Sequence, residues 1–334
     1  MNEARITPWN GCIYQTDTSF PDHLAGELAH ADSPLRARPA GDQDTQSPAL
    51  PGAAQSATLP GAFGPFFAVE GPLVQTFWHR NVWLEPFIVE FDSISQAARA
   101  LKDIQRNWAP ALYTSFRRGE LVRDKLPYIN TKTKTFPWLL PESPMGAYTL
   151  LDDHLMVASA RCSSPFPGGI LDLAEDKVNP PSRAYRKLQE ALILARRWPQ
   201  TGERCLDAGA CPGGWTWVLD QLGASVLAVD RSPLDERLMD KPNIEFLAHD
   251  AFTLKPADIG PFDWIFSDVI CYPSRLLEWV RGWLDSGLCK NFICTIKMQG
   301  DWDRETTRAF ASIPGSFVVH LNNNKHELCW IKVE

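Results

Sequence analysis

The segment Arg204–Asp230 constrains the fold more than any other part of the chain. It reads RCLDAGACPGGWTWVLDQLGASVLAVD, and its short first apolar run ends at Asp207. The glycine-rich turn Gly209–Gly214 follows, and apolar side chains then recur on one side of an expected helix until Gly223, where a helix would stop. A second apolar run ends in Asp230. The segment therefore predicts a strand–helix–strand unit of a nucleotide-binding sheet.

The composition of the turn narrows the kind of ligand. Its glycines lack the G-x-G-x-x-G spacing that brings a backbone close to a pyrophosphate, and no lysine follows as it does in a P-loop. A ligand with an adenosine and no phosphate fits better, and S-adenosylmethionine is the common one. The residues expected to hold it here are Asp207, Gly209, Ala210, Cys211, Pro212, Gly213, Gly214 and Trp215. The alternative is a tight strand–helix turn without a ligand.

The chain after this unit continues to alternate strands with helices. We expect strands at 244–247, 262–266 and 291–296, helices at about 273–285 and 303–312, and a closing hairpin of 317–321 with 327–333. Such alternation is typical of an α/β fold with a mostly parallel sheet and helices on both faces. The C-terminal hairpin is expected to be antiparallel.

Charged residues follow the strands of this expected sheet. The carboxyl ends of parallel strands meet at one rim, where ligands bind. At this rim Asp230 would accept hydrogen bonds from ribose hydroxyls and Asp250 from an adenine amine, whereas Asp268 and Lys297 lie nearer the reacting centre. A lysine at the end of a buried strand is costly unless it is paired. A purely structural ion pair between Lys297 and Asp268 is therefore the other interpretation.

The N-terminal half predicts a separate small α+β domain at residues 1–160. We expect a strand at 11–16, a helix at 21–30, one strand at 83–91, a helix at 93–108 and a hairpin around 152–154. The Pro- and Ala-rich stretch at about 32–60 has almost no large apolar residue and predicts a flexible insertion. The Pro- and Gly-rich stretch 161–181 predicts a linker to a second domain at 182–334, whose first helix Ser182 would cap.

The net charge and the cysteines of the chain indicate which partners and which cellular location to expect. The net charge of −7 gives no whole-protein attraction to nucleic acid, but the basic segment 117–134 is interleaved with aromatic residues and could bind phosphates and stack bases. An exposed loop with ordinary lysines is the alternative.

The eight cysteines include no C-x-x-C pair and no zinc spacing, so we expect no metal site and a reducing, cytoplasmic setting. We expect no signal peptide and no membrane-spanning segment.

Two motifs resemble a known family. Residues 182–188, SRAYRKL, resemble the S-R-A/S-x-x-K-L segment of FtsJ-type ribose 2′-O-methyltransferases, and residues 207–216, DAGACPGGWT, are similar to that family's glycine-rich turn. The resemblance is closest to the bacterial large-subunit rRNA 2′-O-methyltransferase M subfamily, and it covers about residues 160–334. It implies a Rossmann-like methyltransferase fold, S-adenosylmethionine as cofactor and RNA, expected to be large-subunit rRNA, as substrate.

The resemblance also implies a K-D-K-E catalytic tetrad. The matching positions are Lys187, Asp268, Lys297 and Glu327, which occur in the required order, and Asp268 would also contact the cofactor. A ribose hydroxyl is a weak nucleophile that must be oriented and partly deprotonated. Lys297, with a pKa lowered by Lys187 and by burial, would take the proton or stabilise the forming alkoxide. Asp268 and Glu327 would orient the lysines. The N-terminal region departs from the family by being shorter.

Three other interpretations stay open at this point. Asp268-Val269-Ile270-Cys271 resembles the D-x-P-C element of RNA cytosine-C5 methyltransferases, in which a cysteine thiolate attacks the base, although Ile270 replaces the proline and Cys271 could be a packed thiol. A nucleotide-fold protein that binds RNA without catalysis would have no use for lysines at strand ends. A methyltransferase acting on small molecules or proteins agrees with the acidic net charge but not with the basic segment.

Overall fold

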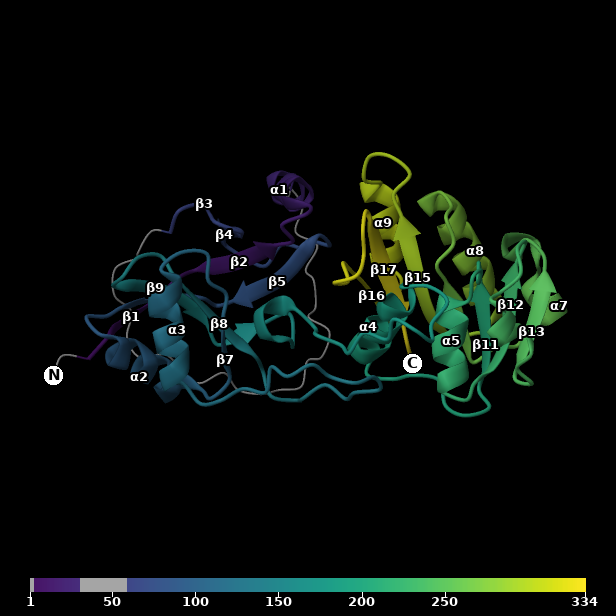
Figure 1. Ribbon diagram of the computed structural model, residues 1–334. Coiled ribbons are helices and arrows are strands. Elements are labelled where there is room, and N and C mark those ends of the chain that lie inside the picture. The colour runs from purple at the N-terminus through teal and green to yellow at the C-terminus, as the bar shows by residue number, and fades with distance from the viewer. Residues whose placement is uncertain (1–2, 31–58) are drawn as a thin grey trace. The chain divides into compact units, whose positions relative to one another are not determined.

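The computed structural model describes residues 3–30 and 59–334 and divides into two compact units (Figure 1). The first unit comprises residues 1–132 and 141–172, and the second comprises 133–140 and 173–334. The division at 172 falls inside the segment expected to be a linker. Residues 133–140, assigned from the sequence to the small domain, belong to the second unit. The expected insertion at 32–60 lies almost wholly outside the described residues.

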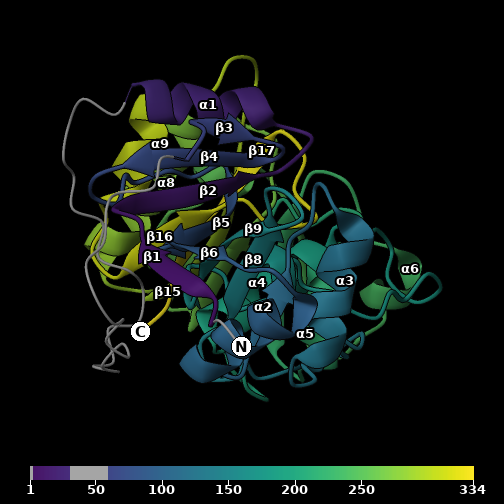
Figure 2. The same cartoon turned by 90° about the vertical axis from the view of Figure 1, so that its left-hand side faces the viewer.

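The first unit is built on two sheets, with orders β1-β6-β9-β8-β7 and β10-β5-β2-β4-β3 within the described residues. Helices α2 and α3 lie side by side against the first sheet (Figure 2). Its other face packs on the second sheet through Val157, Phe66 and Trp83. The elements are β1 Arg5–Pro8, β2 Gly11–Thr16, α1 Pro21–Ala29, β3 Ala62–Phe63, β4 Phe66–Glu70, β5 His79–Leu84, β6 Phe87–Glu90, α2 Ile94–Ile104, β7 Trp108–Pro110, α3 Phe116–Lys125, β8 Gly146–Leu150, β9 Leu155–Ser159, β10 Arg161–Cys162 and the 3₁₀ turn η1 Pro167–Gly169.

The prediction of a single strand at 83–91 is wrong. Glu85 adopts a left-handed backbone with φ of 51°, and Pro86 has no N–H for a ladder, so the run breaks into β5 and β6 in different sheets. The helix expected at 93–108 ends at Ile104, and Ser93 caps it in a capping box. The expected hairpin is confirmed, because β8 and β9 pair antiparallel.

The second unit is a seven-stranded sheet of order β13-β12-β11-β14-β15-β17-β16, and this confirms the expected α/β fold with a mostly parallel sheet. The first five strands are parallel, whereas β17 runs antiparallel to both of its neighbours. The elements are α4 Tyr185–Ala195, β11 Arg204–Ala208, α5 Gly214–Gln221, β12 Ser225–Asp230, α6 Glu236–Met239, β13 Ile244–Ala248, η2 Ala251–Thr253, α7 Pro256–Ile259, β14 Trp264–Ser267, α8 Pro273–Ser286, β15 Asn291–Lys297, α9 Arg304–Ala311, β16 Ser316–Val319 and β17 Glu327–Lys332.

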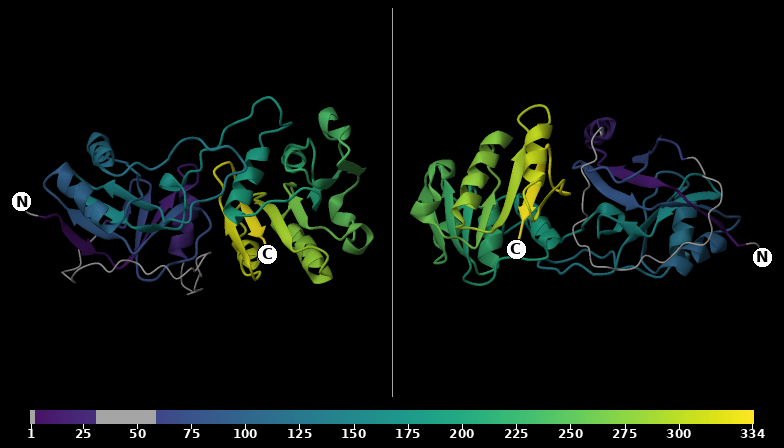
Figure 3. Two further views of the ribbon diagram at one scale, coloured as in Figure 1. Left: turned by 90° about the horizontal axis from the view of Figure 1, so that it is seen from below. Right: turned by 180° about the vertical axis from the view of Figure 1, so that it is seen from behind.

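Helices cover both faces of this sheet (Figure 3). Helices α4 and α5 bury leucines against Phe266 and Ile293 on one face. On the other face, Phe310 of α9 packs its ring 5.4 Å from that of Trp330 in β17, and α8 runs alongside. Alternate residues of each central strand therefore face opposite helical layers, which explains the continuous apolar runs of the sequence.

Helix α4 begins two residues later than expected. Its N-cap is Ala184, without a side-chain cap, and not Ser182. Ser182 instead packs against the start of α5, where a Cβ built on Gly214 would lie 2.4 Å from the Ser182 hydroxyl. Among residues 3–30 and 59–334, no helix is both long enough and apolar enough to cross a membrane.

Candidate active site

Three strands and one helix bring the four tetrad residues together. Lys297 ends β15 and lies directly opposite Glu327, which begins β17. Asp268 follows Ser267, the last residue of β14, the strand that pairs with β15 on its other side. Lys187 reaches the same place from the first turn of α4. The register of the sheet therefore fixes three of the four side chains at one rim, and α4 supplies the fourth.

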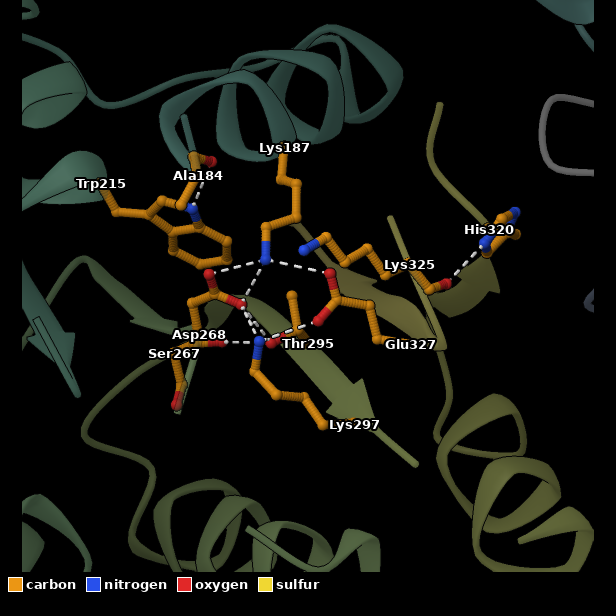
Figure 4. Close-up of polar contacts among 10 residues, drawn as sticks. All are labelled: Ala184, Lys187, Trp215, Ser267, Asp268, Thr295, Lys297, His320, Lys325 and Glu327. Carbon is orange, nitrogen blue, oxygen red and sulfur yellow. Dashed lines mark hydrogen bonds and ion pairs between the residues drawn. The ribbon is translucent and has the colours of Figure 1, made fainter. Parts of the chain in front are cut away.

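The tetrad forms a closed set of ion pairs (Figure 4). Lys187 Nζ donates to both oxygens of Asp268 at 2.7 Å and to Glu327 Oε1 at 3.0 Å. Lys297 Nζ donates to Asp268 Oδ1 and to Glu327 Oε2, both at 2.8 Å. Each carboxylate thus joins both lysines, and the four charges cancel. The ion pair between Lys297 and Asp268, which the alternative interpretation of the sequence proposed, is present as part of this larger cluster.

A fifth residue, missed from the sequence, orients the cluster. Thr295 Oγ1 donates to Asp268 Oδ1 at 2.7 Å, from the position on β15 two residues before Lys297. Side chains two apart on a strand point to the same face, so that spacing could have identified it. Thr295 is buried, and its hydroxyl fixes the carboxylate that both lysines share.

The electrostatics of the cluster correct one expectation. Burial alone would lower the pKa of Lys297, but the nearby Asp268 and Glu327 carboxylates outweigh it and raise that pKa above its usual value. Burial would likewise raise the pKa of Asp268, and the two lysines reverse the shift and lower it. The expectation that the pKa of Lys297 is lowered is therefore wrong. Lys187 is not the dominant neighbour of Lys297, because two carboxylates lie between the ammonium groups.

The glycine-rich turn packs tightly against neighbouring segments. Gly209 has a φ of 80°, and a Cβ there would lie 2.8 Å from Val269. Gly213 has a φ of 108° and precedes α5. The backbone N–H of Cys211, which is exposed, donates to Asp230 Oδ2 at 3.0 Å. The peptide between Cys211 and Pro212 is cis. The tip of β12 and the turn are therefore held together by Asp230.

A cavity of about 190 Å³ lies beside this turn, at the carboxyl ends of β11, β12, β13 and β14. Gly209, Asp230 and Asp250 line it together with apolar side chains such as Phe252 and Val269. An apolar cleft with a carboxylate at a strand tip suits a nucleoside. The chain therefore fits an adenosine-containing cofactor at this place.

Other residues expected to hold the cofactor lie away from the lining of this cavity. Ala210 is buried, and the buried Trp215 donates its indole N–H to the Ala184 carbonyl at 2.9 Å. Asp207 is 1% exposed and accepts a 2.6 Å hydrogen bond from Thr216. Burial raises the pKa of Asp207 to about 7, against the opposing effect of Thr216. These buried residues pack behind the glycine-rich turn.

Asp250 lines the cavity but already has cationic partners. Its Oδ2 lies 2.6 Å from Arg231 and 3.4 Å from Arg275, and its Oδ1 accepts the Phe252 N–H at 3.0 Å. Burial would raise the pKa of Asp250, but these partners lower it. Its carboxylate organises the loop after β13, which the sequence did not indicate.

The structure also shows where Cys271 and the basic segment 117–134 lie. Cys271 is half-buried beside the cavity, and burial raises the pKa of its thiol, which disfavours a thiolate.

Part of the basic segment forms helix α3 in the first unit, and the aromatic residues Phe116 and Tyr128 are exposed. Lys134 belongs to the second unit and lies 5.5 Å from the ring centre of Trp138. Within the described residues, no group of three or more His, Cys, Asp or Glu side chains could hold a metal ion.

The fold and the rim of charged residues define the class of the second unit. Residues 180–327, which lie within the second unit, match the model of the FtsJ-like methyltransferase family. The resemblance inferred from residues 182–188 and 207–216 is thereby confirmed. The match spans the tetrad, from Lys187 to Glu327.

Curated relatives agree with this assignment. The chain is 35% identical over 222 residues to "Ribosomal RNA large subunit methyltransferase M" of Xanthomonas axonopodis pv. citri. It is 34% identical over 224 residues to the protein of the same name from Xanthomonas campestris pv. campestris. Both matches cover 63% of this chain, which spans 59% of the length of each relative. Among solved structures, a fibrillarin pre-rRNA processing protein of Methanococcus jannaschii is 18% identical over 45% of this chain and 75% of its own, with a TM-score of 0.34, and we draw no inference from so low a similarity.

Proposed function

We propose that the protein is an S-adenosylmethionine-dependent RNA ribose 2′-O-methyltransferase acting on large-subunit rRNA. The closed cluster of Lys187, Asp268, Lys297 and Glu327 carries this proposal. The matching family and the names of the curated relatives support the same reaction and the same class of RNA. The free, unpaired cysteines of the chain agree with a cytoplasmic location.

The cofactor is proposed to bind at the cavity beside the glycine-rich turn. Asp230 would accept hydrogen bonds from its ribose, and the turn Gly209–Gly214 would contact its methionine part. When bound, the cofactor supplies an electrophilic methyl group on a sulfonium. Asp207 and Trp215 are proposed to act indirectly, because both are buried behind the turn.

The donors of the two lysines suggest which one faces the substrate. An ammonium has three N–H donors. Lys187 donates to both carboxylates, and the two Asp268 oxygens share one of its N–H groups because they belong to one carboxylate; its side chain is 9% exposed. Lys297 also donates to both carboxylates, but its side chain is 16% exposed at the end of β15, so its third N–H direction is left for a substrate oxygen. We therefore assign the contact with the 2′-hydroxyl to Lys297, and a supporting role to Lys187.

The raised pKa of Lys297 decides its chemical role. In the proposed reaction the ribose oxygen would bond to the methyl carbon, the bond from that carbon to the cofactor sulfur would break with its electron pair left on sulfur, and the hydroxyl proton would be released. A lysine that already holds its proton cannot remove another, but its positive charge stabilises an oxyanion as that develops. Lys297 would thus favour loss of the hydroxyl proton to solvent, while Asp268 and Glu327 hold the ammonium in place.

The experiment follows a labelled methyl group from S-adenosylmethionine into RNA. The purified full chain is incubated with rRNA from cells that lack the gene, and the product is hydrolysed in alkali. Alkaline cleavage requires a free 2′-hydroxyl, so a 2′-O-methyl group leaves a labelled dinucleotide. Label in mononucleotides would instead indicate a methylated base, as in the cytosine-C5 alternative. Label in protein or small molecules alone would refute an RNA substrate.

A further inference from the structure

The tetrad is electrically neutral, and this leaves the attraction of an anionic substrate to other residues. Among the residues that the structure describes, its two lysines and two carboxylates pair only with one another, except for the Thr295 hydroxyl. RNA carries one negative charge per nucleotide, and phosphate contacts supply much of its affinity for proteins. A cation near the tetrad, without a carboxylate partner, would supply that contact.

Lys325 has these properties. It lies in the loop between β16 and β17, two residues before Glu327, and its side chain is exposed. Figure 4 shows this side chain running from the loop toward the cluster. No ion pair involves it among the residues that the structure describes. Its ammonium therefore remains available at the outer side of the tetrad.

The backbone of Lys325 is held although its side chain is not. Its carbonyl oxygen accepts the N–H of Glu327 at 2.9 Å, and His320 Nε2 lies 3.1 Å from the same oxygen. Met298, which follows Lys297, donates its N–H to the neighbouring His326 carbonyl at 3.2 Å. The loop that carries Lys325 is thus tied to the strand end that carries Lys297, which keeps the third lysine close to the reacting group.

The arginines beside the cavity and before α4 are already paired. Arg231 and Arg275 both bind Asp250. Arg183, before α4, is paired with Glu175. An arginine engaged by a carboxylate gives little net attraction to a phosphate unless that pair breaks. Lys325 is in this respect different from the cations on the cofactor side of the site.

We propose that Lys325 binds a backbone phosphate of the RNA next to the ribose that is methylated. This inference rests on the proposed function, since it assigns the substrate contact of the same site. A phosphate held there would place the adjoining ribose over the tetrad, whose Lys297 retains one unused N–H direction. Lys325 is a positioning residue and takes no part in the methyl transfer itself.

The test compares Lys325→Ala and Lys325→Arg with the wild-type full chain. The matched control is Lys290→Ala, an exposed lysine that precedes β15 at the opposite end of the strand from Lys297. The dissociation constant of a mixed-sequence single-stranded RNA is measured by fluorescence anisotropy at several salt concentrations. Steady-state methylation of rRNA gives kcat and KM, and calorimetry with S-adenosylhomocysteine gives the affinity for the cofactor product.

Lys325→Ala is expected to raise the RNA dissociation constant on the order of threefold to tenfold and to make the salt dependence shallower by about 0.7 in logarithmic slope. The KM for RNA should rise with kcat unchanged at saturation. Lys325→Arg should retain the wild-type values because it keeps the charge, and Lys290→Ala should match the wild type.

Several results would overturn the inference. Unchanged RNA affinity and salt slope in Lys325→Ala would remove the phosphate contact. A lower kcat with unchanged KM would assign the lysine to chemistry, and weaker S-adenosylhomocysteine binding would assign it to the carboxylate of the cofactor. A wild-type protein that methylates no RNA would refute the proposed function instead, and that outcome is recognised without any Lys325 variant.

Discussion

The buried carboxyl of Asp207 makes the stability of the second unit depend on pH. It lies in β11 behind the glycine-rich turn, 1% exposed, with Thr216 as its hydrogen-bond donor. Burial raises its pKa to about 7 from an ordinary value of 3.8, and the nearby Asp268 and Asp230 act in the same direction. The folded state therefore holds this proton more tightly than the unfolded state does.

The sign and size of the effect follow from linkage. Between about pH 4 and pH 7 the folded chain binds more protons at this site, so the free energy of unfolding falls as pH rises and levels off above the folded pKa. One pKa unit is worth about 1.4 kcal/mol, and roughly two units of the shift lie above pH 5. Asp207 should thus remove roughly 3 kcal/mol of stability between pH 5 and pH 8.

Asp207→Asn removes this titration and tests the argument. Hydrogen exchange of the β11 and β12 amides, measured in both proteins at pH 5 and pH 8, reports the opening free energy of the second unit by itself. The difference between variant and wild type should shift in favour of the variant by roughly 3 kcal/mol at the higher pH. Other titrating groups are shared and cancel. A difference that stays constant within about 1 kcal/mol between the two pH values would refute the reasoning.

Three further predictions concern the site. Asp230→Ala should weaken S-adenosylhomocysteine binding in calorimetry on the order of tenfold, because it removes a charged hydrogen-bond acceptor and the tie to the turn, and unchanged affinity would exclude the ribose contact. Thr295→Val should lower kcat on the order of tenfold without a change in the KM for cofactor, and Thr295→Ser should restore it, whereas equal rates would show that Asp268 needs no such donor. Cys271→Ser should leave methyl transfer to RNA intact, and a complete loss would favour the cytosine-C5 alternative.

The sequence predicts the site best where a charged residue directly follows an apolar strand. A lysine at the end of a buried strand is costly unless it is paired, and the order of strands and helices along the chain is enough to place Asp268 and Lys297 at one rim. The cross-strand pairing of Lys297 with Glu327 then follows from the antiparallel hairpin. Lys187 is identified only through the family resemblance, because a lysine on a helix carries no signal of its own.

Other features cannot be predicted from the sequence because they depend on tertiary contacts. Thr295 looks like an ordinary strand threonine until Asp268 lies beside it. The sequence predicts the wrong direction for the pKa of Lys297, since it indicates burial and a second lysine but not that both carboxylates stand between them. The break at Glu85 and Pro86 escapes prediction because apolar residues continue on both sides.

Our central proposal is that Lys297, held in place by the sheet and helix of the second unit, acts on a ribose hydroxyl. The most direct measurement is the yield of alkali-resistant labelled dinucleotide from rRNA with wild-type protein and with Lys297→Ala, alongside calorimetry with S-adenosylhomocysteine. We expect labelled dinucleotide with the wild type, none with the variant, and nearly equal affinity for the cofactor product in both. Full methylation by a Lys297→Ala variant that still binds the cofactor product would contradict it.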